Sequence, residues 1–229
     1  MKPYTFLTLQ LASRDINAYY FTGNKGGKRP GLVFLHDITG IQNSTLETAY
    51  LLSEEGLRVL VPDLYTNSWG VKYCVRQVID RFIRDNLSGN KALEEIHQII
   101  DAFQKFKDVD PNRLSLVGSC LTGGFVLHAS LRPEIKAPVV FHHSFGLTGS
   151  GFPEECVGSV KHTIQGHFCH TDPLCPPEKV DRLEEQLGDK LERHDYDLPH
   201  MIPHLFRFNE EGKEAYERML RFIKEKVYE

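Results

Sequence analysis

The sequence has few cysteines, a single tryptophan and no long hydrophobic run. Its five cysteines are odd in number and irregularly spaced, which argues against a disulfide framework and favours reduced thiols in a reducing compartment. No apolar stretch approaches the length needed to span a bilayer. The N-terminal segment also lacks the apolar core and small-residue cleavage site of a signal peptide. We therefore expect a cytoplasmic protein that has no membrane partner.

An excess of charge of one sign is also missing. The chain carries 27 basic and 31 acidic residues, a net charge of −4, so we expect no binding to nucleic acid. Hydrophobic residues make up 41% of the 229 residues, which is ordinary for a globular protein and sufficient for a substantial core. No repeat, low-complexity tract or linker interrupts the sequence. It predicts one domain over residues 1–229, and no feature sets an oligomeric state.

Short apolar runs alternate with helical patterns along the chain. This alternation predicts an α/β fold, in which a mostly parallel central sheet carries helices on both faces. The stretch 64–90 is less regular and is a candidate lid or cap. We expect strands at 4–9, 16–22, 32–36, 57–61, 114–118, 137–142, 161–166 and 190–197, and helices at 44–55, 93–106, from the glycine turn near 121 to about 131, 177–187 and 211–227.

Residues 113–124, RLSLVGSCLTGG, form the most informative segment. A short apolar strand runs directly into Cys120 and then into glycines, which is how a nucleophile is mounted on a sharp turn between a strand and a helix. At the start of that helix the sulfur would meet the positive end of the helix dipole, which favours the thiolate. The alternative interpretation is a buried core cysteine, because cysteine is among the most buried residue types.

Polar residues that follow later strands extend this candidate site, because reactive groups gather at the carboxyl ends of parallel strands. Asp172 follows strand 161–166, and His200 and His204 follow strand 190–197. The order nucleophile, acid, histidine is that of the α/β-hydrolase arrangement, with cysteine in place of serine. One histidine would take the proton of the Cys120 thiol, and Asp172 would hold that ring in the productive tautomer.

Two backbone N–H groups are candidates for the oxyanion hole of such a site. One belongs to Leu121, directly after the nucleophile, and the other to Ile38, in the loop after an earlier strand. His36 ends that earlier strand, where we expect it to pack. We expect His142 and His143, at the end of another strand, to line the pocket as polar residues.

Three segments resemble the dienelactone hydrolase family: PGLVFLHDITG at 30–40, VPDLY at 61–65 and GSCLTGG at 118–124. The similarity extends over roughly residues 16–227, and the combination is far more specific than any one segment. The resemblance implies an α/β-hydrolase fold and a Cys-His-Asp triad. It also implies hydrolysis of small esters or lactones through an acyl-cysteine intermediate, without a metal or another cofactor.

The resemblance also assigns residues one by one. Asp37 stands where the family has an acidic residue that contacts the resting thiol, although it is one methylene shorter. The family binds its substrate's carboxylate with arginines, so Arg207 and Arg81 are candidates and the substrate would be anionic. For the triad histidine, His204 keeps the family's His-x-Phe pattern, whereas His200 keeps the spacing from the preceding tyrosine better. We favour His204.

Two alternatives to an ester hydrolase stay open. Thr122 stands where the family usually has glycine, and a β-branched residue there would crowd the turn. Together with the uncertain histidine and the shorter Asp37, it leaves room for a catalytically idle α/β-hydrolase scaffold that binds a ligand or a partner. The third interpretation is a metal-binding module in 167–175, HFCHTDPLC, since cysteine and histidine at short spacing suit Zn²⁺. The paired spacings of a zinc site are missing, so we expect no metal.

Overall fold

The computed structural model describes residues 3–67, 91–143 and 149–228. The chain divides into two compact units, Met1–Pro111 and Asn112–Glu229. Strands and helices alternate in both units and most strand pairs are parallel, which confirms the predicted α/β class. The prediction of a single domain stays a prediction. None of the helices in the described ranges combines the length and apolar character that crossing a membrane requires.

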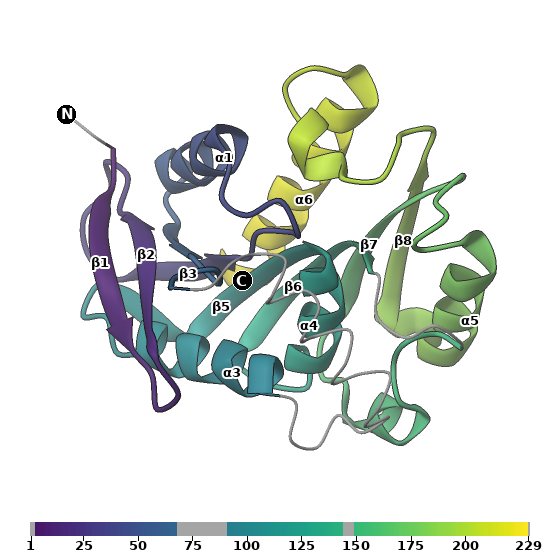
Figure 1. Ribbon diagram of the computed structural model, residues 1–229, viewed down its shortest axis with the longest axis horizontal. Coiled ribbons are helices and arrows are strands. Elements are labelled where there is room, and N and C mark those ends of the chain that lie inside the picture. Colours follow the sequence, from purple (N-terminus) through teal and green to yellow (C-terminus); the bar gives the residue numbers. More distant parts are fainter. Residues whose placement is uncertain (1–2, 68–90, 144–148, 229) are drawn as a thin grey trace. The chain divides into compact units, whose positions relative to one another are not determined.

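The first unit begins with an antiparallel hairpin (Figure 1). Its strands β1 (Thr5–Gln10) and β2 (Asp15–Phe21) were expected from their alternating apolar residues, and β2 continues antiparallel against β4 (Arg58–Pro62). The strand β3 (Arg29–Phe34) then pairs parallel with β4. Every residue of β4 is buried, as expected for a strand inside a covered parallel sheet.

In the described part of the first unit, two helices cover the strands. The helix α1 (Asn43–Glu54) packs against β4, and α3 (Lys91–Gln104) packs against β3. The predicted apolar stripe of α3 is buried, through Ala92, Ile96, Ile99, Ile100 and Phe103. Of the candidate lid at 64–90, the residues from 68 onward lie outside the described residues.

The second unit places four parallel strands side by side (Figure 1). In chain order they are β5 (Val109–Cys120), which begins at the boundary between the units, β6 (Ile135–His143), β7 (Ile164–Cys169) and β8 (Leu191–Tyr196). The predicted strand 161–166 starts three residues late, because polar Lys161, His162 and Thr163 precede the buried run. This shift places the end of β7 closer to Asp172.

Three α-helices and three short 3₁₀ helices complete the second unit. The helices α4 (Leu121–Ala129) and α6 (Glu210–Tyr228) both pack on β6, from opposite faces of the sheet (Figure 1). The helix α5 (Pro177–Leu187) packs on β8 and has the predicted bounds. The 3₁₀ helices are η1 (Glu154–Ser159), η2 (Gly188–Lys190) and η3 (Ile202–Leu205).

Candidate active site

Cys120 occupies the sharp turn that the sequence predicts. It is the last residue of β5, and α4 starts at the next residue. Its backbone has φ 60° and ψ −119°, a conformation that residues with a side chain rarely adopt. The side chain is buried, with 5% of the residue exposed. Strained backbone of this kind persists only where the surrounding structure enforces it, and such strain clusters at functional sites.

Close backbone packing enforces the turn. A Cβ atom on Gly118 would lie 2.6 Å from the carbonyl oxygen of Thr122, and one on Gly123 would lie 2.4 Å from the carbonyl oxygen of His142. Both distances are too short for any side chain. The close approach that the family pattern assigns to position 122 is therefore made at Gly123.

Thr122 closes the turn instead of crowding it. Its hydroxyl oxygen accepts a hydrogen bond from the Ser119 N–H at 3.0 Å, and the hydroxyl donates to the Ser119 carbonyl at 2.9 Å. Both bonds are buried, where a hydrogen bond to the backbone contributes most. The departure from glycine at this position is thus compatible with the turn.

Asp172 and His200 form a short hydrogen bond. The Nδ1–H of His200 donates to Oδ2 of Asp172 at 2.6 Å, and the Asp172 side chain is fully buried. The other carboxylate oxygen accepts the N–H groups of Leu174 at 2.9 Å and Cys175 at 3.2 Å. Burial by itself raises the pKa of Asp172, but the bonds from His200 and Leu174 outweigh it and the pKa lies below its ordinary value. The carboxylate is therefore ionised and fixed in direction.

The other side of the His200 ring acts on Cys120. Burial alone would lower the pKa of His200, but hydrogen bonds with Asp172 and the Cys120 thiol, and the charges of both, raise it to about 9. The contact to sulfur is looser than a regular hydrogen bond, because the buried Nε2 has no partner within the usual length and angle limits among the described residues. Such contacts often tighten only when substrate binds. At neutral pH His200 is an imidazolium beside the sulfur.

The structure pairs Asp172 with His200 and not with His204, which the His-x-Phe pattern favoured. His204 lies in η3, and its backbone N–H donates to the Met201 carbonyl at 3.0 Å, whereas the ring bonded to Asp172 belongs to His200. The physical reason is Met201, which adopts a left-handed conformation with φ 82°. The chain therefore reverses directly after His200 and begins η3. The His-x-Phe pattern at 204 does not reveal this turn, whereas the spacing from Tyr196 does favour His200.

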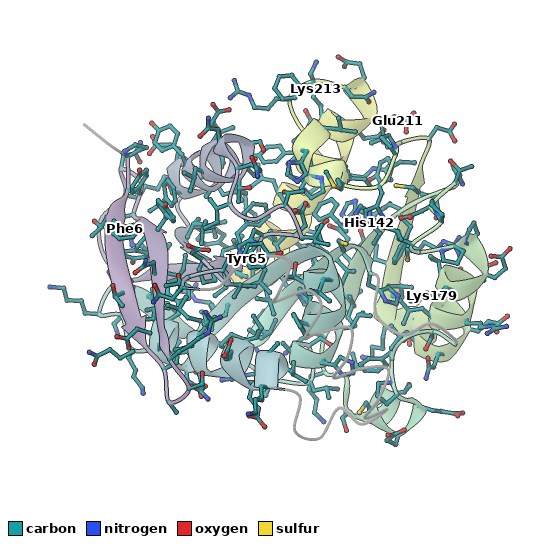
Figure 2. All side chains as sticks on the ribbon, viewed as in Figure 1. Phe6, Tyr65, His142, Lys179, Glu211 and Lys213 are labelled. Carbon is teal, nitrogen blue, oxygen red and sulfur yellow. The ribbon has the colours of Figure 1, made fainter. Side chains whose placement is uncertain are left out.

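From the sequence, His142 is expected only to line the pocket as a polar residue; in the structure its ring lies against His200 and close to the residue before Cys120. It is the next-to-last residue of β6 and is completely buried (Figure 2). Its ring centroid lies 3.9 Å from that of His200. Its Nε2 lies 3.0 Å from the Met201 N–H nitrogen and 3.2 Å from the Ser119 hydroxyl oxygen. In the sequence, only the position of His142 at the end of a predicted strand could have indicated these contacts.

The same residues account for the one set of metal-ligand atoms that the described residues bring together. One ligand atom each from His142, Asp172 and His200 lies within 4.8 Å of the others. Within this set, a 2.6 Å hydrogen bond from the His200 ring already occupies one carboxylate oxygen of Asp172. We therefore assign no metal to this set.

The cysteine- and histidine-rich segment 167–175 is not gathered into a metal site. The ring of His167 is buried with Nδ1 2.9 Å from the Tyr196 hydroxyl and Nε2 3.0 Å from the Gln165 amide oxygen. Burial lowers its pKa well below the ordinary value, so the ring is neutral and structural. The Cys169 thiol donates to a backbone carbonyl, and burial raises its pKa to about 12.

The remaining predicted residues have these local environments. Asp37 accepts the N–H and hydroxyl of Thr39 at 2.8 and 2.7 Å, and Ile38 is 51% exposed. Arg207 is exposed and follows η3, while Arg81 lies outside the described residues. The predicted thiol contact of Asp37, the oxyanion roles of Leu121 and Ile38, and the carboxylate-binding role of the arginines stay predictions.

His36 packs at its strand end as expected. Its Nδ1 lies 2.7 Å from the Asp37 carbonyl oxygen, and its Nε2 accepts the Leu64 N–H at 3.0 Å. Burial lowers the pKa of the ring, so it stays neutral. His36 therefore holds the backbone at residue 64.

The mostly parallel strands and the sharp turn at Cys120 define this protein as an α/β hydrolase. The model of the dienelactone hydrolase family matches residues 16–226. The chain belongs to that family, which confirms the resemblance inferred from its motifs.

Curated relatives carry names of the same kind. A proposed carboxymethylenebutenolidase of Synechocystis sp. is 20% identical over 197 residues, which cover 80% of this chain and 78% of that protein. A proposed esterase of Bacillus subtilis (strain 168), YitV, is 30% identical over 172 residues. These cover 74% of this chain and 61% of YitV, so the chain spans about three fifths of that relative.

Solved structures share the fold at low sequence identity. A proposed dienelactone hydrolase from Klebsiella pneumoniae matches with a TM-score of 0.76 and 19% identity over 96% of this chain and 97% of that one. A dienelactone hydrolase-like promiscuous phosphotriesterase from metagenomic libraries matches with a TM-score of 0.78 and 15% identity, covering 97% and 98% of the two chains. At these identities the likeness supports the fold alone.

Proposed function

We propose that this protein hydrolyses small esters or lactones through an acyl-Cys120 intermediate. Cys120 is the nucleophile, His200 is its proton partner and Asp172 orients and charges His200. The observation that carries the proposal is the series of contacts from buried Asp172 through His200 to Cys120, in which the pKa of His200 rises to about 9. A thiol needs such a partner, because the thiolate is the reactive form and an ordinary thiol is mostly protonated at neutral pH.

The first half of the reaction forms the acyl-enzyme. The Cys120 thiolate attacks the carbonyl carbon of the ester, and the carbonyl oxygen becomes an oxyanion. The backbone N–H of Leu121, the first residue of α4, is proposed to donate to this oxyanion. The bond from carbon to the leaving oxygen then breaks, and the leaving oxygen takes the proton from Nε2 of His200. In a lactone this oxygen stays attached to the acyl chain.

The second half releases the acid. Acylation removes the negative charge on sulfur, and that charge is one of the causes that raise the pKa of His200. The neutral ring can therefore accept a proton through Nε2 from a water molecule, whose oxygen attacks the thioester carbonyl. The carbon–sulfur bond then breaks, and the thiolate re-forms beside the imidazolium. Asp172 keeps Nδ1 protonated throughout, so Nε2 is always the nitrogen that exchanges protons.

The substrate class follows from the nucleophile and from the relatives. A thiolate leaves more readily than an amide nitrogen, so a cysteine nucleophile suits esters, lactones and thioesters better than amides. The name of the Synechocystis relative, a proposed carboxymethylenebutenolidase, fits a lactone. We propose an anionic substrate whose carboxylate binds Arg207, since a guanidinium can bind a carboxylate through two hydrogen bonds.

No observation favours the idle scaffold. The two features of the second unit that kept it open were Thr122 and the choice of histidine. The hydroxyl of Thr122 bonds the turn, and His200 is bonded to Asp172. These contacts support the proposed hydrolase over the idle scaffold.

Hydrolysis of p-nitrophenyl acetate and of a panel of neutral and anionic lactones tests the proposal. We expect turnover that Cys120→Ala and His200→Gln abolish, and an acyl adduct on Cys120 that mass spectrometry detects when the reaction is quenched. His204→Gln is the matched control on the same loop and should retain turnover. Hydrolysis that persists in Cys120→Ala would overturn the proposal.

A further inference from the structure

A bulge in β6 places His142 opposite the nucleophile turn. Along the β5–β6 pair, Ser119 is opposite Phe141 and Cys120 is opposite His143, so His142 is the additional residue. Its φ of 35° is positive, which is unusual for a residue with a side chain. Bulges next to active sites commonly redirect a side chain. Here the redirected ring turns toward the neighbours of both reacting residues.

The Nε2 atom of His142 contacts the residue next to each of the two reacting residues, Cys120 and His200. Nε2 accepts the N–H of Met201, the residue after His200, at 3.0 Å. The hydroxyl of Ser119, the residue before Cys120, lies 3.2 Å from the same nitrogen. Each bonded group is therefore one residue away from a reacting side chain. A displaced His142 would release both at once.

These contacts also set the charge of His142. A backbone N–H can only donate, so Nε2 must carry its lone pair and the ring is neutral. The ring lies against His200, with centroids 3.9 Å apart and planes inclined by 35°. A second positive charge at this distance would oppose the imidazolium form of His200. A neutral ring supplies a packing face without that penalty.

We propose that His142 is a positioning residue that fixes the His200 ring relative to the Cys120 sulfur. It does so by accepting the Met201 N–H and the Ser119 hydroxyl through Nε2, while its neutral ring places no second charge beside His200. The inference rests on the proposed function, because it assigns His142 to that same reaction. His142 does not exchange a proton with the substrate.

Three variants separate positioning from mere packing. His142→Gln keeps an acceptor at the place of Nε2, since the side-chain oxygen is the same number of bonds from the backbone. His142→Met has similar length but no acceptor for the Met201 N–H. His167→Met is the matched control, because it also removes a completely buried neutral histidine from the neighbouring strand.

Two rates are measured on each purified full-length variant, with its folded fraction measured by circular dichroism. They are the alkylation of Cys120 by iodoacetamide at about pH 6, followed on the Cys120 peptide by mass spectrometry, and the turnover of p-nitrophenyl acetate. We expect His142→Met to lower both rates per folded molecule by about tenfold to 100-fold, with little change in KM. His142→Gln and His167→Met should each stay within about threefold of the wild type.

The outcomes are distinct. Wild-type rates in His142→Met, or equal losses in His142→Met and His142→Gln, overturn the positioning role while the hydrolase proposal stands. If Cys120 of the wild type is alkylated no faster than an ordinary cysteine, and His200→Gln does not change that rate, the proposed function is overturned. The positioning role of His142 then falls as well. A loss in His142→Met that His142→Gln restores supports both.

Discussion

Replacing Asp172 with asparagine changes the proton on His200 without removing the loop contacts. An asparagine oxygen can still accept the N–H groups of Leu174 and Cys175, which now bond one oxygen of Asp172. The asparagine NH₂ group then faces Nδ1 of His200, at the place where Oδ2 of Asp172 accepts the Nδ1–H hydrogen bond in the wild type. Two donors cannot share that contact, so the ring is expected to change tautomer and carry its proton on Nε2. Nε2 then takes a proton from Cys120 only in the less populated tautomer.

The magnitude follows from the pKa of His200. Its rise from 6.5 to about 9 reflects bonds from Asp172 and Cys120, with the bond from Asp172 the larger of the two. If Asp172 supplies roughly half of the rise, its loss lowers the pKa by about one unit, or about 1.4 kcal/mol. The thiolate–imidazolium pair then falls about tenfold. Turnover should fall further, by about 10²-fold to 10⁴-fold, because deacylation loses its base as well.

The assay is the alkylation rate of Cys120 as a function of pH. In the wild type we expect rapid alkylation to persist well below the pH at which an ordinary thiol ionises, roughly pH 8.5. In Asp172→Asn the profile should shift toward that of an ordinary thiol, and the two proteins should converge at alkaline pH. Asp181→Asn, an exposed ion-pair residue on α5, is the control and should keep the wild-type profile. Superimposable profiles for Asp172→Asn and the wild type would refute the reasoning.

Three further predictions concern stability. Because the pKa of His200 is raised, its protonated form stabilises the folded state fully below about pH 6.5. This contribution is lost as the pH rises through about 9. The difference in the free energy of unfolding between the wild type and His200→Gln should therefore narrow over that range. Urea denaturation measures it, and a difference independent of pH contradicts the raised pKa. Gly123→Ala places a Cβ atom 2.4 Å from a carbonyl oxygen and should lower the free energy of unfolding by about 2 kcal/mol or more, as measured by thermal unfolding. Gly158→Ala, whose Cβ atom would have nothing within 4 Å, should lower it little. Equal melting temperatures for these two variants would show that the turn is not tightly packed. Thr122→Val removes both hydroxyl bonds to Ser119 and should cost about 1 to 3 kcal/mol, so an unchanged melting temperature would contradict their role.

The class of fold and the nucleophile turn could be predicted because each has a local sequence signature. Apolar runs and helical stripes marked most strands and helices to within a few residues, and the helix 177–187 has its predicted bounds. The turn at Cys120 was visible because small residues surround a cysteine after a buried strand. Asp172 was also visible, because it follows a strand and precedes proline.

The spacing from Tyr196 favoured His200, but the turn that brings it to Asp172 and the contacts of His142 could not be predicted, because both depend on unusual backbone angles. Met201 has φ 82° and His142 has φ 35°, and neither residue type favours a positive value. Such conformations are imposed by tertiary contacts, here the hydrogen bond from the Met201 N–H to His142 itself. The close backbone packing at Gly123, rather than at position 122, also depends on a tertiary contact, here with the carbonyl oxygen of His142.

The four side chains that act on one another around the sulfur all come from the second unit. Cys120, His142, Asp172 and His200 follow one another in that order, each at or shortly after the end of a successive parallel strand. Their order and the nucleophile turn form a signature that can be searched for in other chains without regard to residues 1–111. A relative that keeps all four should have an equally reactive thiol even where the rest of its sequence has diverged.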